Sequence, residues 1–183
     1  TGFFDILNAC LRRLFPFGWV EVNNALVLAF GMAGVAGTFF AGRLAGGFPV
    51  GLAAAVLLVL TPRYTGHAFM NPKDIPFAAT YIWGLWALMR CHFVDESKPL
   101  LKRVLLFGLL AGLCASTRIG GLLLPAYAGL IFGIEAVRSL LHDRSGAMLR
   151  RKVHLGAIWF LGFLTCMLVL FLFWPAAHGN PLS

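Results

Sequence analysis

The sequence has few charged residues. Only 12% of its 183 residues are Asp, Glu, Lys or Arg, and 60% are hydrophobic, whereas a soluble domain carries about 25% charged residues. The apolar residues also come in long runs and do not alternate with polar ones. These features argue against a soluble globular protein. They predict an all-α fold, a polytopic bundle of transmembrane helices.

Several functional motifs are missing as well. The sequence contains neither a GxGxxG element nor a P-loop, so nothing in it indicates a bound nucleotide. Its four cysteines form no CxxC pair. The net charge of +8 does not come from a basic stripe interleaved with aromatic residues, so nucleic acid is not an expected partner. Membrane lipids are the partners that the apolar runs imply.

The apolar runs predict about six spans, since about twenty helical residues cross the hydrocarbon core. We place them at residues 22–42, 49–60, 75–90, 104–115, from 122 to about 137, and 155–173. In the first span, Gly31, Gly34 and Gly37 predict a small-residue face for close helix contact. Residues 3–15 are amphipathic and predict a helix lying in the membrane interface.

The predicted spans, residues 22–173, belong to one transmembrane domain. Residues 1–18 are interpreted as the end of an outer loop with its juxtamembrane helix, and residues 174–183 as the start of another outer loop. The chain starts at Thr1 without Met and ends in this predicted loop. We therefore expect it to be part of a longer protein and to be inactive alone.

The distribution of Lys and Arg predicts the orientation. Ten of the 15 cations fall on the side that holds Arg43, residues 90–103 and residues 138–154, and five fall on the other side. The richer side should be cytoplasmic. The segment 61–75, the turn at 116–121 and the C-terminal residues are then expected on the extracytoplasmic face.

The most informative segment is a polar insert, residues 61–76, between two apolar runs. Charge at a membrane edge is costly unless it anchors the protein or forms a site, so we expect the chemistry here. Asp74 is the candidate catalytic residue. The candidate substrate-binding residues of the insert are Arg63, Tyr64, His67, Asn71 and Lys73.

Each candidate also has a structural interpretation. Asp74 directly precedes an apolar helix and is expected to cap its N-terminus, which leaves a second oxygen free for function. Arg63 and Lys73 either extend to lipid head groups or bind phosphate. His67 and His178 are lone histidines expected on the extracytoplasmic face. They are a weak metal signal, and such histidines are more often ordinary interface residues.

Arg118 stands almost alone between apolar residues. An arginine so close to the hydrocarbon should have an anionic partner, for which a lipid phosphate or Asp74 would serve. A plain head-group anchor is the alternative. Ser116 and Thr117 are expected to bond backbone groups that are freed where the helix breaks.

The run TPRYTGHAFMNPKDIPF at residues 61–77 resembles the second extracytoplasmic loop of bacterial GT-C glycosyltransferases. The similar branch is the family 39-like one, related to protein O-mannosyltransferases and the aminoarabinose transferase. The segment from Ser116 to Arg118 is similar to another recurring element of that branch, and residues 1–16 look like the end of its first outer loop. The resemblance covers the whole chain, and TPR…NPKDIP is its most specific part.

The resemblance implies a multi-pass enzyme of the bacterial inner membrane with an extracytoplasmic site. Such enzymes transfer a sugar from a polyprenyl-phosphate donor to a lipid, protein or glycan acceptor. Their main base is an acidic residue of the first outer loop, which would precede Thr1, and Asp5 does not match it. Asp74 matches the second-loop acidic position. It would orient the acceptor or a cationic group, or bind a divalent metal in the metal-dependent relatives.

The resemblance makes Arg63, Lys73 and Arg118 candidates for the donor phosphate.

Two other classes of protein stay open. A transporter or flippase would line a pathway with charges near the midplane and often has internal repeats, but no convincing repeat relates the two halves. A non-catalytic scaffold would leave Asp74 and Arg118 on separate patches, whereas the enzyme requires them to converge on one cavity.

Overall fold

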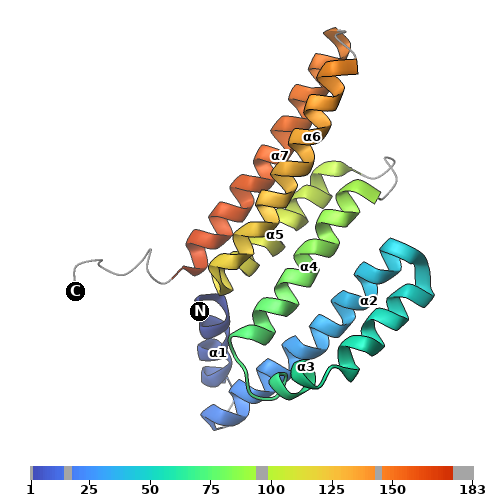
Figure 1. The fold of residues 1–183 in the computed structure, drawn as a ribbon. Helices are drawn as coiled ribbons and strands as arrows, with labels where there is room; N and C mark the ends of the chain where they lie inside the picture. The colour runs from blue at the N-terminus through green and yellow to red at the C-terminus, as the bar shows by residue number, and fades with distance from the viewer. Residues whose placement is uncertain (1, 15–17, 94–98, 143–145, 175–183) are drawn as a thin grey trace.

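The computed structural model describes residues 2–14, 18–93, 99–142 and 146–174. These residues form helices and no strands, which confirms the all-α fold (Figure 1). The helices are α1 (Gly2–Leu14), α2 (Trp19–Leu60), α3 (Pro62–His67), α4 (Asp74–Phe93), α5 (Leu100–Thr117), the 3-10 turn η1 (Ile119–Leu122), α6 (Leu123–His142) and α7 (Gly146–Phe173).

Three of the described helical segments are long and apolar enough to cross a membrane. They are Trp19–Leu60, Leu100–Thr117 and Leu155–Phe173, and a shorter apolar stretch covers Ile119–Ile134. The fold is thus that of a helical membrane bundle, while the count of six spans stays a prediction. The predicted terminal loop, residues 175–183, lies outside the described residues.

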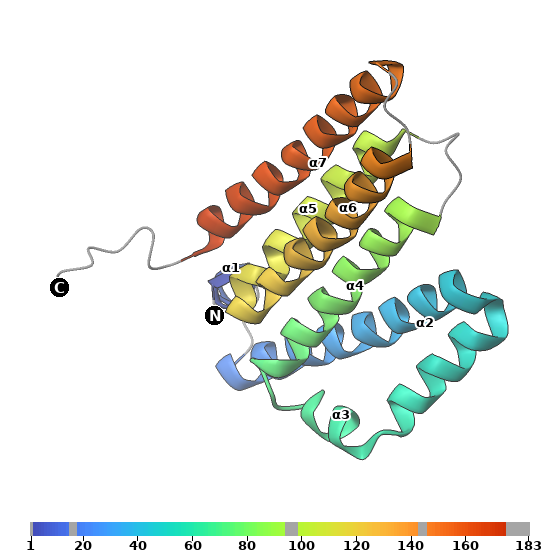
Figure 2. The same ribbon diagram turned by 45° about the horizontal axis from the view of Figure 1, so that its top comes forward.

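α2 is a hairpin of two helical arms. The backbone leaves helical geometry at Gly46 and at Gly47, whose φ of 82° favours glycine, and the chain then turns back on itself (Figures 1 and 2). The turn falls where the sequence predicts a break. The second arm, residues 49–60, is about 18 Å long at 1.5 Å per residue. It is shorter than the roughly 30 Å of hydrocarbon that a span must cross.

α1 is the amphipathic helix that the sequence predicts. Phe4 is 1% exposed and packs in a cluster with Leu26, Val27 and Ile75. On the same helix, the Asn8 side chain donates a 3.1 Å hydrogen bond to Asn23 Oδ1 of α2. α1 is therefore fastened to the start of α2 by both apolar and polar contacts.

Small residues let the main helices approach closely. Gly108 of α5 lies against the backbone of Gly162 in α7, and a Cβ at either position would collide with the partner helix. Around them Phe107, Ala111 and Cys166 are almost fully buried. In lipid, helices associate through such packing because the hydrophobic effect does not drive them together.

The predicted small-residue face of α2 is confirmed. Gly31, Gly34 and Gly37 are all buried. Ala68 packs on Gly31, the Tyr64 hydroxyl on Gly34, and the Trp83 indole on Gly37. Two hydrogen bonds to α2 backbone carbonyls reinforce this contact, from Tyr64 to Gly31 (2.8 Å) and from Trp83 to Ala33 (2.9 Å). The insert is thereby held against α2.

The helix ends sort into two groups. α1, α3, the start of α4 and the junction of α5 with α6 lie together at one end of the bundle, shown at the lower left in Figure 1. The α2 bend and the ends of α4 and α6 lie toward the other end. This division agrees with the two sides that the sequence predicts.

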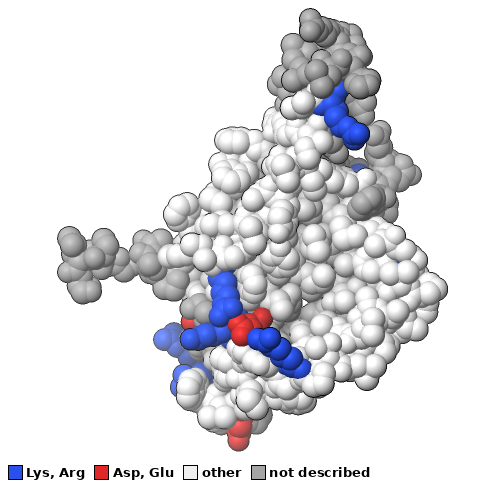
Figure 3. All heavy atoms as spheres, viewed as in Figure 1, with Lys and Arg blue, Asp and Glu red and all other residues white. Residues whose placement is uncertain are grey.

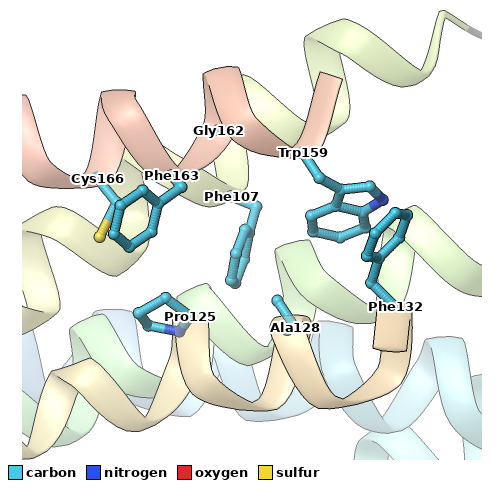
Figure 4. Close-up of a pocket in the computed structure, with 9 residues that line it drawn as sticks. Phe107, Pro125, Ala128, Phe132, Trp159, Gly162, Phe163 and Cys166 are labelled. Carbon is cyan, nitrogen blue, oxygen red and sulfur yellow. The ribbon is translucent and has the colours of Figure 1, made fainter. Parts of the chain in front are cut away.

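An apolar groove lies between α5, α6 and α7. Its lining includes Phe107, Phe132, Trp159, Phe163 and Cys166, whose side chains surround one space of about 120 Å³ (Figure 4). Gly129 and Gly133 of α6 have no neighbour within 4 Å of a Cβ position. α6 is thus loosely packed along this groove.

The contact between α3 and α2 predicts a rescue experiment. Gly34→Ala should destabilise the protein by roughly 1–3 kcal/mol because its Cβ would collide with the Tyr64 hydroxyl. Tyr64→Phe removes the colliding oxygen and leaves a ring carbon 3.4 Å from that Cβ. In thermal unfolding in detergent, the double variant Gly34→Ala/Tyr64→Phe should lose less stability than the sum of the losses in the two single variants.

Gly66→Ala is the matched control, because nothing lies within 4 Å of its Cβ position. It should leave the unfolding midpoint nearly unchanged. Equal losses from Gly34→Ala with and without the Tyr64 hydroxyl would contradict the packing described above.

Candidate functional site

The polar insert is not the plain loop that the sequence suggests. Pro62–His67 forms the short helix α3, with Pro62 at its first turn, where proline is tolerated. The chain then turns and enters α4. The start of α4 is capped by Asn71, whose Oδ1 accepts the backbone N–H groups of Lys73 (3.1 Å) and Asp74 (3.0 Å).

This capping corrects the role expected of Asp74. The predicted N-cap is wrong because Asp74 lies three residues after the residue that caps the helix. Its carboxylate instead accepts a 2.8 Å hydrogen bond from Asn71 Nδ2 at Oδ2. The other oxygen, Oδ1, is left for a partner from elsewhere in the chain.

That partner is Arg118. Its Nη1 lies 2.5 Å from Asp74 Oδ1, and the two side chains are 47% and 48% exposed. The expected contact between Asp74 and Arg118 is confirmed, but the hollow described below is lined by neither residue, so their convergence on one cavity stays a prediction. The pair joins the start of α4 to the end of α5.

The break at the end of α5 places Arg118. Its backbone is extended (φ −151°, ψ 146°), and the two preceding residues are buried. Ser116 Oγ donates to the Leu113 carbonyl (2.8 Å) and Thr117 Oγ1 to the Cys114 carbonyl (2.6 Å). The Cys114 carbonyl also accepts the Arg118 backbone N–H (3.1 Å). The hydroxyls therefore add bonds to carbonyls of the last turn of α5, and the expectation that they bond groups freed at the break is not confirmed.

A second constraint acts just after Arg118. The Gly121 N–H donates to the Arg118 carbonyl (2.9 Å), and a Cβ on Gly121 would collide with the backbone at Cys114 and Ala115. The chain therefore folds back tightly on α5 before α6 begins. This close return holds the Arg118 backbone at the bundle end.

His67 belongs to the same hydrogen-bonded chain. Asn71 Nδ2 lies 2.6 Å from His67 Nδ1 and also donates to Asp74. Since Asn71 Oδ1 accepts two backbone N–H groups, its nitrogen is the donor in both contacts. His67 Nδ1 is then the acceptor, and the ring proton is on Nε2.

A hollow of about 440 Å³ opens beside this chain. It is lined by Gly66, His67, Met70, Asn71, Pro72 and Lys73. Arg63 and Lys73 are exposed, and neither has an acidic partner among the described residues. Figure 3 shows Lys and Arg atoms gathered around Asp and Glu atoms at this end of the molecule, with a broad uncharged surface beyond.

Tyr64 is placed differently from the other candidates. Its hydroxyl donates to the Gly31 carbonyl, and burial raises the pKa of Tyr64 above its ordinary value of 10.0. The hydroxyl is therefore protonated at neutral pH and serves as a donor inside the α2–α3 contact. The structure gives Tyr64 a packing role and does not bring its hydroxyl to the ion pair.

A metal site has little basis in the described residues, where no three His, Cys, Asp or Glu side chains cluster. His178 lies outside the described residues. The sequence reasoning missed the double role of Asn71. Its spacing of three residues before Asp74 is the signal that could have revealed the cap.

Comparison with protein-family models, characterised proteins and solved structures finds no match to this chain.

The capping role of Asn71 predicts a graded response. Asn71→Ala should lower the free energy of unfolding by about 1 kcal/mol through the lost cap. Asn71→Ser keeps a capping oxygen, so it should recover most of this stability in thermal unfolding. Serine lacks the amide nitrogen that joins His67 to Asp74. Equal stabilities of the Ala and Ser variants would rule out the cap.

Proposed function

We propose that this chain is part of a membrane glycosyltransferase that moves a sugar from a polyprenyl-phosphate donor to an acceptor on the extracytoplasmic face. The observation that carries the proposal is the Asp74–Arg118 pair, formed between two helix breaks at one end of the bundle. The resemblance of residues 61–77 to the second outer loop of GT-C enzymes supports the same class.

The magnitudes favour a functional pair over a stabilising one. An ion pair with both side chains about half exposed stabilises a fold by about 1 kcal/mol at most. An exposed pair beside apolar helices is thus better explained as a site for a charged ligand.

The reaction would use these groups in a specific way. An acceptor hydroxyl oxygen attacks the anomeric carbon, the bond from that carbon to the phosphate oxygen breaks, and negative charge moves onto the phosphate. Arg118 stabilises this charge. Asp74 orients the acceptor hydroxyl, whose proton would pass to the acidic residue that the GT-C resemblance implies in the first outer loop, ahead of Thr1.

A lipid donor also fits the apolar surroundings. The described part of the bundle exposes many large hydrophobic side chains on α2, α6 and α7, and the groove of Figure 4 adds a further apolar surface. Such surfaces suit a substrate that stays in the membrane while its phosphate reaches the bundle end.

Arg118 variants of the intact protein test the proposal. Arg118→Gln should lower transfer from polyprenyl-phosphate-linked sugars about 100-fold or more, with little change in protein level, because an exposed pair adds little stability. Arg118→Lys keeps the charge but lacks the planar guanidinium group, so its transfer rate should lie between those of the wild type and Arg118→Gln. Arg43→Gln, an exposed cation near the α2 bend, is the matched control.

Product formation in isolated membranes, measured with a panel of labelled sugar donors, is the readout. Normal turnover by Arg118→Gln would contradict the phosphate role. Movement of the labelled lipid between leaflets without any glycosylated product would instead favour a flippase.

A further inference from the structure

We propose that the hollow beside His67 is a second anion site, separate from the Asp74–Arg118 pair, and that it binds a phosphate group. His67 and Lys73 line the hollow, and we add Arg63 to the site because it precedes His67 by one helical turn in α3. It rests on the proposed function only in one respect, the assignment of this phosphate to the acceptor substrate.

The hollow and the ion pair are separated by Asn71. Its side-chain amide donates one N–H to Asp74 Oδ2 and the other to His67 Nδ1. The Asp74 charge is matched by Arg118 on the far side of Asn71. On the near side the hollow is lined by His67 and Lys73, with no acidic side chain in its lining.

The contact with Asn71 orients the His67 ring. Two backbone N–H groups hold Asn71 Oδ1, so the Asn71 nitrogen faces His67 Nδ1 and cannot accept a proton from it. The imidazole therefore carries its proton on Nε2. Since the ring lines the hollow, Nε2–H is the donor available to a ligand there.

Lys73 and Arg63 supply positive charge to this site. Lys73 lines the hollow and is exposed. Arg63 lies four residues before His67 in α3, so both are on the same helix face. Within the described residues, neither cation is neutralised by an ion pair. The hollow thus has the His67 ring and the Lys73 cation in its lining, with Arg63 on the same face of α3 as His67.

These groups match a phosphate in particular. A phosphate has several acceptor oxygens directed outward, and it is bound by charge-assisted hydrogen bonds from Arg and Lys. The volume of about 440 Å³ is also large enough for such a group and part of what carries it. For the transferase, the ligand would be a phosphate-bearing acceptor lying close to Asp74. Arg63 and Lys73 would then bind the acceptor phosphate and not the donor phosphate that the resemblance implies for them.

Binding of inorganic phosphate to the intact protein in phosphatidylcholine nanodiscs tests the site directly. Titration calorimetry should detect binding by the wild type. The phosphate affinity should fall about tenfold in each of Lys73→Gln, Arg63→Gln and His67→Phe. His67→Gln should lose less affinity because its amide can still donate a hydrogen bond. Arg43→Gln is the matched control and should bind as the wild type does.

A second arm distinguishes the source of the phosphate. Nanodiscs that contain phosphatidic acid should compete with inorganic phosphate if a lipid head group is the ligand. If the ligand is a soluble phosphate compound, phosphatidic acid should not compete. Absence of phosphate binding by the wild type, or an equal loss in Arg43→Gln, would overturn the site in either case.

Nitrogen NMR of the histidine rings tests the orientation of His67 independently. In protein labelled at its histidines, the His67 signals, assigned from their loss in His67→Gln, should show the proton on Nε2. A proton on Nδ1 would overturn the proposed donor. Phosphate binding without sugar transfer would contradict the proposed transferase but support the anion site. Sugar transfer without phosphate binding would support the transferase and contradict the anion site.

Discussion

Backbone groups that are freed at a helix break in an apolar bundle must find partners within the protein, and this constraint shapes the whole site. At the entry to α4 the partner is the Asn71 side chain. At the end of α5 the Arg118 N–H still donates to the Cys114 carbonyl, and the Arg118 carbonyl accepts the Gly121 N–H. Because these neighbours satisfy the backbone, the charged side chains of Asp74 and Arg118 are free to meet each other.

The two breaks meet because glycines bring the helices together. α3 and α4 lie on the small-residue face of α2, where Gly34 leaves room for the Tyr64 hydroxyl. Beyond Arg118, Gly121 allows the chain to return against α5. A larger residue at either position would move one break relative to the other. Packing several turns from the charges therefore determines the geometry of the pair.

The sequence predicts the helices, the hairpin break and the common side of the two motifs because long apolar runs and glycine placement are local signals. It also anticipates the Asp74–Arg118 contact, since a lone arginine near hydrocarbon needs an anion. It does not predict α3 or the Asn71 cap, which depend on side-chain geometry within the insert. The role of Tyr64 was missed because its acceptor, the Gly31 carbonyl, lies 33 residues away.

Asn71 has to be an amide for this arrangement to hold. An aspartate there could still cap α4, but it would place a second carboxylate against Asp74 and a lone pair against His67 Nδ1. Like charges at such short range repel, and Arg118 could match only one of them. A serine would cap the helix yet reach neither neighbour. Only a side chain with one acceptor and two donors can cap the helix, orient Asp74 and direct the His67 proton outward at once.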